Sequence, residues 1–266
     1  MLKTRVITAV VMAIIGLSAL FLSPPALFAL LAGILLLGIG GWEAGRLAGL
    51  ESGTHSLLYA CVLLTLGALL FVLLRPAWTG ALLLGGALLW LGALFWLARP
   101  RSGAALRKFK LAVLGGILLS AWLAAITLQA GSPWLVVLLV IIIAAADIGA
   151  YFSGRAIGGP KLAPSISPGK TQSGAIGGLL AATLAAAAVV MALPEAPFRP
   201  LAAALVGLVL AALSIGGDLL ISLLKRQRGL KDSSALLPGH GGVLDRFDSL
   251  GAALPFFALA WIWWGQ

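Results

Sequence analysis

The chain has 266 residues, of which 61% are hydrophobic and only 10% are charged. Soluble domains carry about 25% charged residues, so this composition excludes a soluble globular protein and indicates an integral membrane protein. The single cysteine, Cys61, excludes an internal disulfide and suggests a packing residue. The net charge of +10 could reflect nucleic-acid binding or the orientation of a membrane protein, and the positions of the charges decide between the two.

Hydrophobic segments indicate the fold. A membrane-spanning helix needs about 20 mostly apolar residues, and nine segments of the chain approach or meet that length. The predicted fold is therefore all-α, a polytopic integral membrane protein with about nine transmembrane helices. The first two segments are short and meet at a Ser-Pro-Pro sequence, so they form either a tight hairpin or one broken element. The predicted spans are residues 6–22, 25–40, 57–74, 78–98, 111–128, 134–152, 175–193, 201–224 and 249–264.

The basic residues indicate how this bundle is oriented. If the N-terminus is cytoplasmic, 16 of the 18 Lys and Arg residues fall in cytoplasmic loops, and the exceptions are Arg75 and Arg199. Cytoplasmic loops accumulate Lys and Arg, so this orientation is expected and nucleic acid is not an expected partner. The loop at residues 99–110, with five cations, is interpreted as an orientation signal that faces anionic lipids rather than substrate.

The predicted organisation places N-terminal membrane helices at residues 1–130 and a catalytic membrane region at residues 131–266. Two polar cytoplasmic segments, residues 153–174 and 225–248, lie in the second region. We expect a multi-pass protein of a bacterial-type inner membrane, with its active site facing the cytoplasm.

Two carboxylates, Asp147 and Asp218, lie inside predicted membrane helices. An ionisable residue there costs roughly 2.5–3.5 kcal/mol on insertion scales, so each needs a partner or a function. Asp218 shares a helix face with Ser214, Ser222 and Lys225, because spacings of four, four and three residues return to the same side. This polar face favours a functional site over a carboxylate that is merely satisfied by helix packing.

Asp245 and Asp248 are three residues apart, so they share a face at the start of the last helix. Together with Asp218 they would place three carboxylates near several cations. Such a site suits Mg²⁺, which prefers a few carboxylates combined with phosphate oxygens and retained water. Zinc is disfavoured, because the only other common ligands are one Cys and the two histidines, His55 and His240. The predicted metal ligands are therefore Asp218, Asp245 and Asp248, for Mg²⁺ alone or with a second cation.

Two polar segments carry glycines beside groups that could bind anions. Gly241 and Gly242 next to His240 allow close backbone approach, and the SPGKT sequence at residues 167–171 is a polar loop of the anion-binding type. SPGKT lacks the Walker spacing and the preceding strand, so a Walker fold is rejected. These features together indicate phosphoryl-group chemistry at a cytoplasmic membrane surface.

The same segments resemble a known family. The sequence S-x-L-K-R-x4-K-D-x-S-x2-L-P-x-H-G-G-V-x-D-R-F-D at residues 222–248 is similar to the signature of the phosphatidate cytidylyltransferase (CDP-diacylglycerol synthase) family. Residues 147–174 resemble the family's other polar segment, with Ile148, Gln172 and Ser173 where members commonly have Thr, Trp and Glu. WEAGRLAG at residues 42–49 is only a weak echo of the family.

The resemblance implies the reaction of CTP with phosphatidic acid in the membrane to give CDP-diacylglycerol and pyrophosphate, by Mg²⁺-dependent in-line attack on the α-phosphorus. A homodimer is an open alternative to a monomer. Two other functions remain open: a CTP-dependent lipid kinase, which directs attack to the γ-phosphorus, and a proton-coupled transporter. The predicted catalytic residues are Asp218, Lys225, Arg226, Lys231, His240, Asp245 and Asp248. The predicted substrate-binding residues are Asp147, Lys161, Ser165, Ser167, Lys170, Thr171, Ser222, Gly241, Gly242 and Arg246.

Overall fold

A computed structural model describes residues 2–99, 103–192 and 198–265 of the chain. These residues are mostly helical, as the hydropathy pattern predicts. The helices are α1 (Leu2–Leu22), α2 (Pro25–Gly33), the π-helix η1 (Ile34–Ile39), α3 (Gly40–Ala48), α4 (Gly53–Leu73), α5 (Pro76–Leu94), the 3-10 helix η2 (Phe95–Ala98), α6 (Arg107–Gly131), α7 (Pro133–Ile157), α8 (Gln172–Ala192), α9 (Pro200–Gln227) and α10 (Leu244–Trp264).

Eight helical segments within the described residues are long and apolar enough to cross a membrane, and Val6–Leu22 is a shorter apolar helix. The polytopic all-α fold is thus confirmed. The first two segments are separate helices, because α1 ends at Leu22 and α2 begins at Pro25. The predicted end of the second span at residue 40 is wrong: α2, η1 and α3 form one continuous helix, Pro25–Ala48. The predicted span that ends at residue 193 reaches beyond the described part of the chain.

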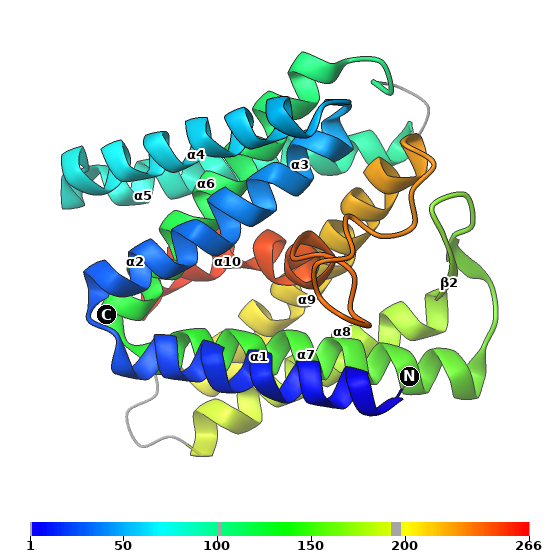
Figure 1. Cartoon of the computed structure of the whole chain (residues 1–266). Coiled ribbons are helices and arrows are strands. Elements are labelled where there is room, and N and C mark those ends of the chain that lie inside the picture. The colour runs from blue at the N-terminus through cyan, green and yellow to red at the C-terminus, as the bar shows by residue number, and fades with distance from the viewer. Residues whose placement is uncertain (1, 100–102, 193–197, 266) are drawn as a thin grey trace.

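The helices form two groups, with α9 and α10 between them (Figure 1). In that view α3 to α6 lie above, and α1, α7 and α8 lie below. The central position of α10 follows from its contacts, since it packs against α5, α6, α7 and α9. Phe257 of α10 and Leu139 of α7 are completely buried in the resulting core.

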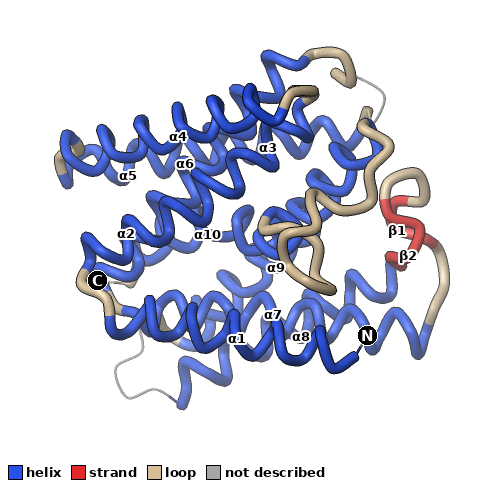
Figure 2. Tube along the Cα trace, viewed as in Figure 1, coloured by secondary structure: helices blue, strands red, loops and turns tan. Residues whose placement is uncertain are grey.

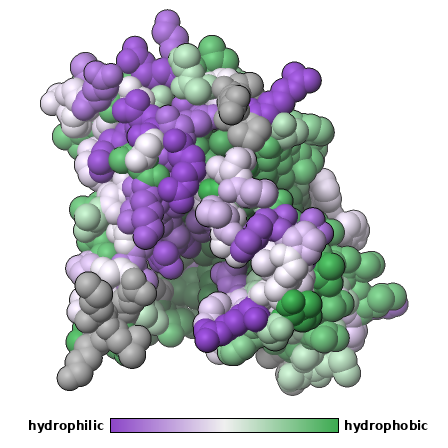
Figure 3. Space-filling view, turned by 90° about the vertical axis from the view of Figure 1, so that its right-hand side faces the viewer, coloured by the Kyte–Doolittle hydropathy of each residue, from purple (hydrophilic) through white to green (hydrophobic). Residues whose placement is uncertain are grey.

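The loops that carry the signature segments lie at one end of the bundle, on the right of Figure 1. We call this the polar end and define it by residues 49–52, 103–106, 158–171 and 228–243. Figure 3 looks onto this end and shows hydrophilic residues gathered over it, with a hollow beneath them. The fold therefore brings the two polar segments predicted from the sequence to the same end.

The first of these segments is more regular than the predicted loop. Strands β1 (Lys161–Ala163) and β2 (Ser167–Thr171) form an antiparallel hairpin, visible in Figure 2, in which Lys161 pairs with Thr171. α8 follows directly, and Thr171 Oγ1 accepts a hydrogen bond from Gly174 N at 3.1 Å. SPGKT thus forms a strand whose last residue caps a helix.

Candidate active site

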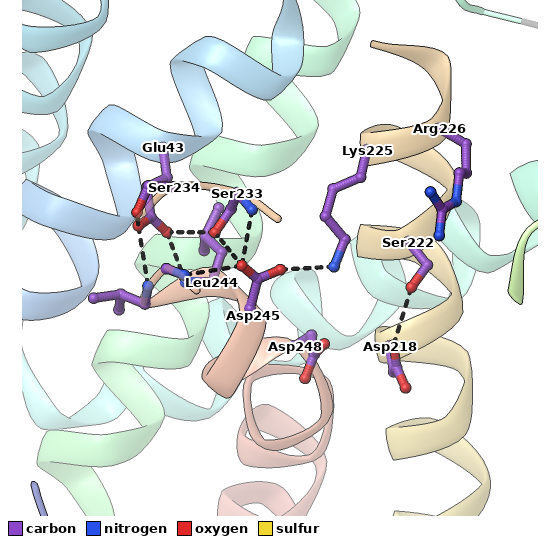
Figure 4. A network of polar contacts seen from close by, with 12 residues as sticks. Glu43, Asp218, Ser222, Lys225, Arg226, Ser233, Ser234, Leu244, Asp245 and Asp248 are labelled. Atoms are coloured by element: carbon purple, nitrogen blue, oxygen red, sulfur yellow. Dashed lines mark hydrogen bonds and ion pairs between the residues drawn. The ribbon is translucent and has the colours of Figure 1, made fainter. Parts of the chain in front are cut away.

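The close crossing of α9 and α10 positions the central carboxylates. A Cβ atom added to Gly217 of α9 would overlap the carbonyl oxygen of Asp248 and lie 2.6 Å from the Cβ of Ala252 in α10. Only glycine permits this approach of the two backbones. The neighbouring residue, Asp218, therefore lies beside Asp248, and Figure 4 shows both carboxylates between the two helices.

Asp218 is paired with a cation from the other polar segment. Its Oδ2 lies 2.5 Å from Lys170 Nζ of β2, and both side chains are 30% exposed. Its Oδ1 accepts a hydrogen bond from Ser222 Oγ at 3.1 Å, one helical turn later. The predicted shared face of Asp218 and Ser222 is thus confirmed, whereas Ser214 is buried and donates to Ala211 O.

Both carboxylate oxygens of Asp245 accept hydrogen bonds. Lys225 Nζ donates to its Oδ1 at 2.6 Å, and these side chains are only 11% and 5% exposed. The other oxygen, Oδ2, accepts hydrogen bonds from Ser233 N, Ser233 Oγ and Gly242 N at 2.8, 2.9 and 2.9 Å. Gly241 has a φ of +79°, a conformation that other residues rarely adopt. Asp245 therefore fixes both Lys225 and the turn that leads into α10.

Glu43 of α3 belongs to the same network and was missed in the sequence. It is completely buried and accepts hydrogen bonds from the first two backbone N–H groups around the start of α10, those of Val243 at 3.0 Å and Leu244 at 2.7 Å. The Ser234 hydroxyl donates to it at 2.6 Å, and the Ser233 hydroxyl, whose single proton is shared between Glu43 and Asp245, lies 3.0 Å from it (Figure 4). Since Val243 makes no side-chain cap of its own, Glu43 caps α10 from another helix.

The reason for missing Glu43 lies in the preceding sequence. Gly40 and Gly41 end the apolar run, so Glu43 was predicted to lie in a loop. In the structure both glycines are buried within a packed helix. WEAGRLAG, the weak echo of the family, was the one signal that pointed to it.

Further charged residues surround the crossing. Asp248 is partly exposed and interacts electrostatically with Asp218, Lys225 and Arg246. Asp147 of α7 is exposed and interacts electrostatically with Lys170, Asp218 and Arg246. The structure therefore brings the predicted Asp147 and Arg246 near the cluster formed by Asp218, Asp248 and the two lysines.

Other predicted residues take peripheral places. Arg226 Nε donates to the carbonyl of Ile166 at 3.4 Å, which links α9 to the β-hairpin. Lys161, Ser165 and Lys231 are exposed at the polar end, and Ser167 is partly exposed in β2. The His240 backbone N–H donates to Leu237 O at 2.9 Å, and its buried Nδ1 has no hydrogen-bond partner among the described residues.

The carboxylates fit Mg²⁺ in part. In the described residues no three His, Cys, Asp or Glu side chains form a metal-binding group. Asp245 is only 5% exposed and its carboxylate already has four donor contacts, three of them at Oδ2, so it does not fit as a free ligand, whereas Asp218 is 30% exposed and has one partner at each oxygen. Asp218 and Asp248 fit better, because Mg²⁺ is commonly bound by one or two carboxylates together with substrate phosphates. The metal and its three predicted ligands remain predictions.

Comparisons with known proteins identify the family of the chain. The model of a cytidylyltransferase family matches residues 3–263. The phosphatidate cytidylyltransferase of Pseudomonas aeruginosa is 44% identical over 278 aligned positions, which cover 100% of this chain and 99% of that protein. The enzyme of the same name from Brucella suis is 38% identical over 257 positions, covering 95% of this chain and 90% of its own. The chain therefore belongs to the cytidylyltransferase family, among the phosphatidate cytidylyltransferases, and is a membrane-embedded nucleotidyltransferase.

Proposed function

We propose that this enzyme transfers the cytidylyl group of CTP to phosphatidic acid, forming CDP-diacylglycerol and pyrophosphate for phospholipid synthesis. The names of its full-length relatives support this reaction. The observation that carries the proposal is the pairing of Lys170 with Asp218 and of Lys225 with Asp245 beside the α9–α10 crossing. This site offers cations for phosphates at the end of a membrane bundle, where a lipid headgroup can reach it.

In the proposed step, an oxygen of the lipid phosphate attacks the α-phosphorus of CTP. A new phosphorus–oxygen bond forms as the bond from the α-phosphorus to the bridging oxygen breaks, and that electron pair leaves with pyrophosphate. The lipid phosphate is already ionised near neutral pH, so no strong general base is needed. Catalysis then depends on aligning two anions and neutralising the leaving group.

The two lysines are suited to this task. An ammonium group has three N–H donors, so Lys225 can keep its bond to Asp245 and still donate to phosphate oxygens. Asp245 is itself fixed by Ser233 and Gly242, which places the Lys225 ammonium before the substrate binds. Such preorganised charge stabilises a transition state at little reorganisation cost.

Asp218 and Asp248 would hold Mg²⁺, or Mg²⁺ with a second cation. When bound, the metal would screen the phosphates from each other and stabilise the departing pyrophosphate. Ser222 and Lys170 orient the Asp218 carboxylate for this role, through the contacts at 3.1 and 2.5 Å.

The polar end would face the cytoplasm, where CTP is available. The distribution of basic residues supports this orientation, because Arg75 and Arg199, the two exceptions, precede α5 and α9 at the opposite end of the bundle.

The direct test uses the purified protein in detergent with labelled CTP, phosphatidic acid and Mg²⁺. We expect equal amounts of CDP-diacylglycerol and pyrophosphate, and we expect added pyrophosphate to drive CDP-diacylglycerol back to CTP. Arg155→Gln, which changes an exposed cation of α7, serves as a control with normal turnover. Release of CDP would instead identify a lipid kinase, and proton-coupled uptake without CTP turnover would identify a transporter.

A further inference from the structure

A second basic site lies at the polar end, beside the proposed active site. A pocket of about 660 Å³ opens between the C-terminus of α3, the loop before α6 and the C-terminus of α9. Its charged lining residues are Arg107, Lys108 and Arg228. None of these belongs to the carboxylate and lysine network at the α9–α10 crossing.

The pocket concentrates positive charge. Among the described residues, its lining has three cations and no acidic side chain. Neither the ion pair of Lys170 with Asp218 nor that of Lys225 with Asp245 involves the pocket. Lys110, a buried residue next to the lining residue Phe109, adds a further cation. Its Nζ donates to Ala104 O at 2.8 Å, and its charge interacts electrostatically with that of Arg228. An anion would relieve the repulsion among these groups.

The start of α6 adds to this potential. Helix N-termini carry partial positive charge and normally favour acidic residues or a polar cap. α6 has no acidic residue in its first turn, and its N-cap residue, Leu106, makes no side-chain cap. Arg107 and Lys108 instead begin the helix, so the side chains and the helix end attract an anion together.

The need for basic cytoplasmic loops does not account for this geometry. The positive-inside tendency concerns the number of cations in a loop, and it does not require Arg228 of another segment to converge with Arg107 on one pocket. The rim is also amphipathic, since Leu106 and Phe109 are 57% and 52% exposed beside the cations. Basic groups next to exposed apolar side chains match the headgroup and upper chains of an anionic phospholipid.

We propose that this pocket is a second binding site for a phosphate-bearing anion, separate from the reacting substrates, with Arg107, Lys108 and Arg228 as its cationic ligands. The shared chemistry is a phosphate group, which either an anionic lipid or a soluble phosphate compound can provide. This site goes beyond the proposed reaction and does not depend on it.

The test measures binding to the full-length protein in neutral detergent, without CTP. Phosphatidylglycerol, phosphatidylcholine and inorganic phosphate are titrated separately, and bound molecules are counted by native mass spectrometry. We compare the wild type with Arg107→Gln/Arg228→Gln and with the matched control Arg155→Gln. A cation near an anionic surface contributes roughly a fivefold change in affinity, so we expect the double variant to bind the preferred phosphate source about 25-fold more weakly.

Further variants keep the result interpretable. Lys108→Gln alters an exposed side chain, should keep the wild-type melting temperature and should weaken binding about fivefold. Asp218→Asn should leave this binding unchanged, which separates the pocket from the active site. Selective loss of phosphatidylglycerol binding assigns the pocket to a lipid headgroup, and selective loss of inorganic phosphate assigns it to a soluble anion. If all variants bind both anions like the wild type, the proposal is overturned.

Discussion

Glu43→Gln is the most informative perturbation of the network, because it keeps the shape of the side chain and removes one acceptor. Glu43 receives three hydrogen bonds of its own and shares the Ser233 hydroxyl with Asp245, and two of the three come from backbone N–H groups that cannot rotate away. A glutamine has one oxygen and one NH₂ group, so a backbone donor of Val243 or Leu244 would face another donor. Losing a hydrogen bond to a charged acceptor and leaving a buried donor unpaired lowers the stability of this region by about 2–4 kcal/mol.

This cost should appear as easier opening of the turn that precedes α10. We expect amide hydrogen exchange in a peptide covering residues 233–244 to quicken by roughly 30-fold or more, since 1.4 kcal/mol corresponds to a factor of ten. A peptide from residues 113–125 of α6 should exchange as in the wild type. The kcat should fall as well, because Asp245 and Lys225 are held through the same network.

The matched control is Glu51→Gln, which changes an exposed glutamate eight residues later in the chain. It should leave both exchange and turnover unchanged. Exchange within twofold of the wild type in Glu43→Gln would refute the view that Glu43 holds the start of α10.

Three further predictions concern the site and its orientation. Asp218→Asn should lower pyrophosphate release about 100-fold or more while the melting temperature stays near that of the wild type, and near-normal turnover with Mg²⁺ would contradict its role. Gly242→Ala should destabilise the protein by about 1–3 kcal/mol and reduce turnover, because the added methyl group would overlap the Ser233 and Glu43 side chains. Gly169→Ala, where a Cβ has no atom within 4 Å, should change the melting temperature and the turnover only slightly. In right-side-out vesicles of a protein without its native cysteine, an impermeant thiol reagent should label Ala77→Cys directly but Ala235→Cys only after the membrane is opened, and direct labelling of the latter would reverse the orientation.

Hydropathy predicted the helices well for a physical reason. Each membrane helix must satisfy its own backbone hydrogen bonds in lipid, so its length and apolar composition are visible locally. The way the helices pack is not visible locally. Gly149 of α7, for example, lies so close to α8 that an added Cβ would be 2.7 Å from Gly177 O. The hydrophobic periodicity of the sequence does not indicate that these two helices pack together.

The site was predictable where one short segment carries it. Asp218, Ser222 and Lys225 lie on α9 and Asp245 begins α10, so spacing indicated which of them share a helix face and the short connecting segment suggested that the two faces meet. The sequence could not show that Asp245 accepts bonds through both oxygens, because one of its donors, Ser233, lies in an irregular loop. Glu43 was missed because its partners are distant in the chain.

The distance between Glu43 and its partners has a consequence for the biogenesis of the protein. Ser233 and Leu244 are 190 and 201 residues downstream of it, so α3 is synthesised long before any of its donors exists. An acidic side chain within a membrane helix is costly until it is paired, and domains form in the order of synthesis. Insertion of α10 therefore completes the proposed active site and pairs the carboxylate of α3 in the same event, so we expect a chain arrested before α10 to be both inactive and unstable.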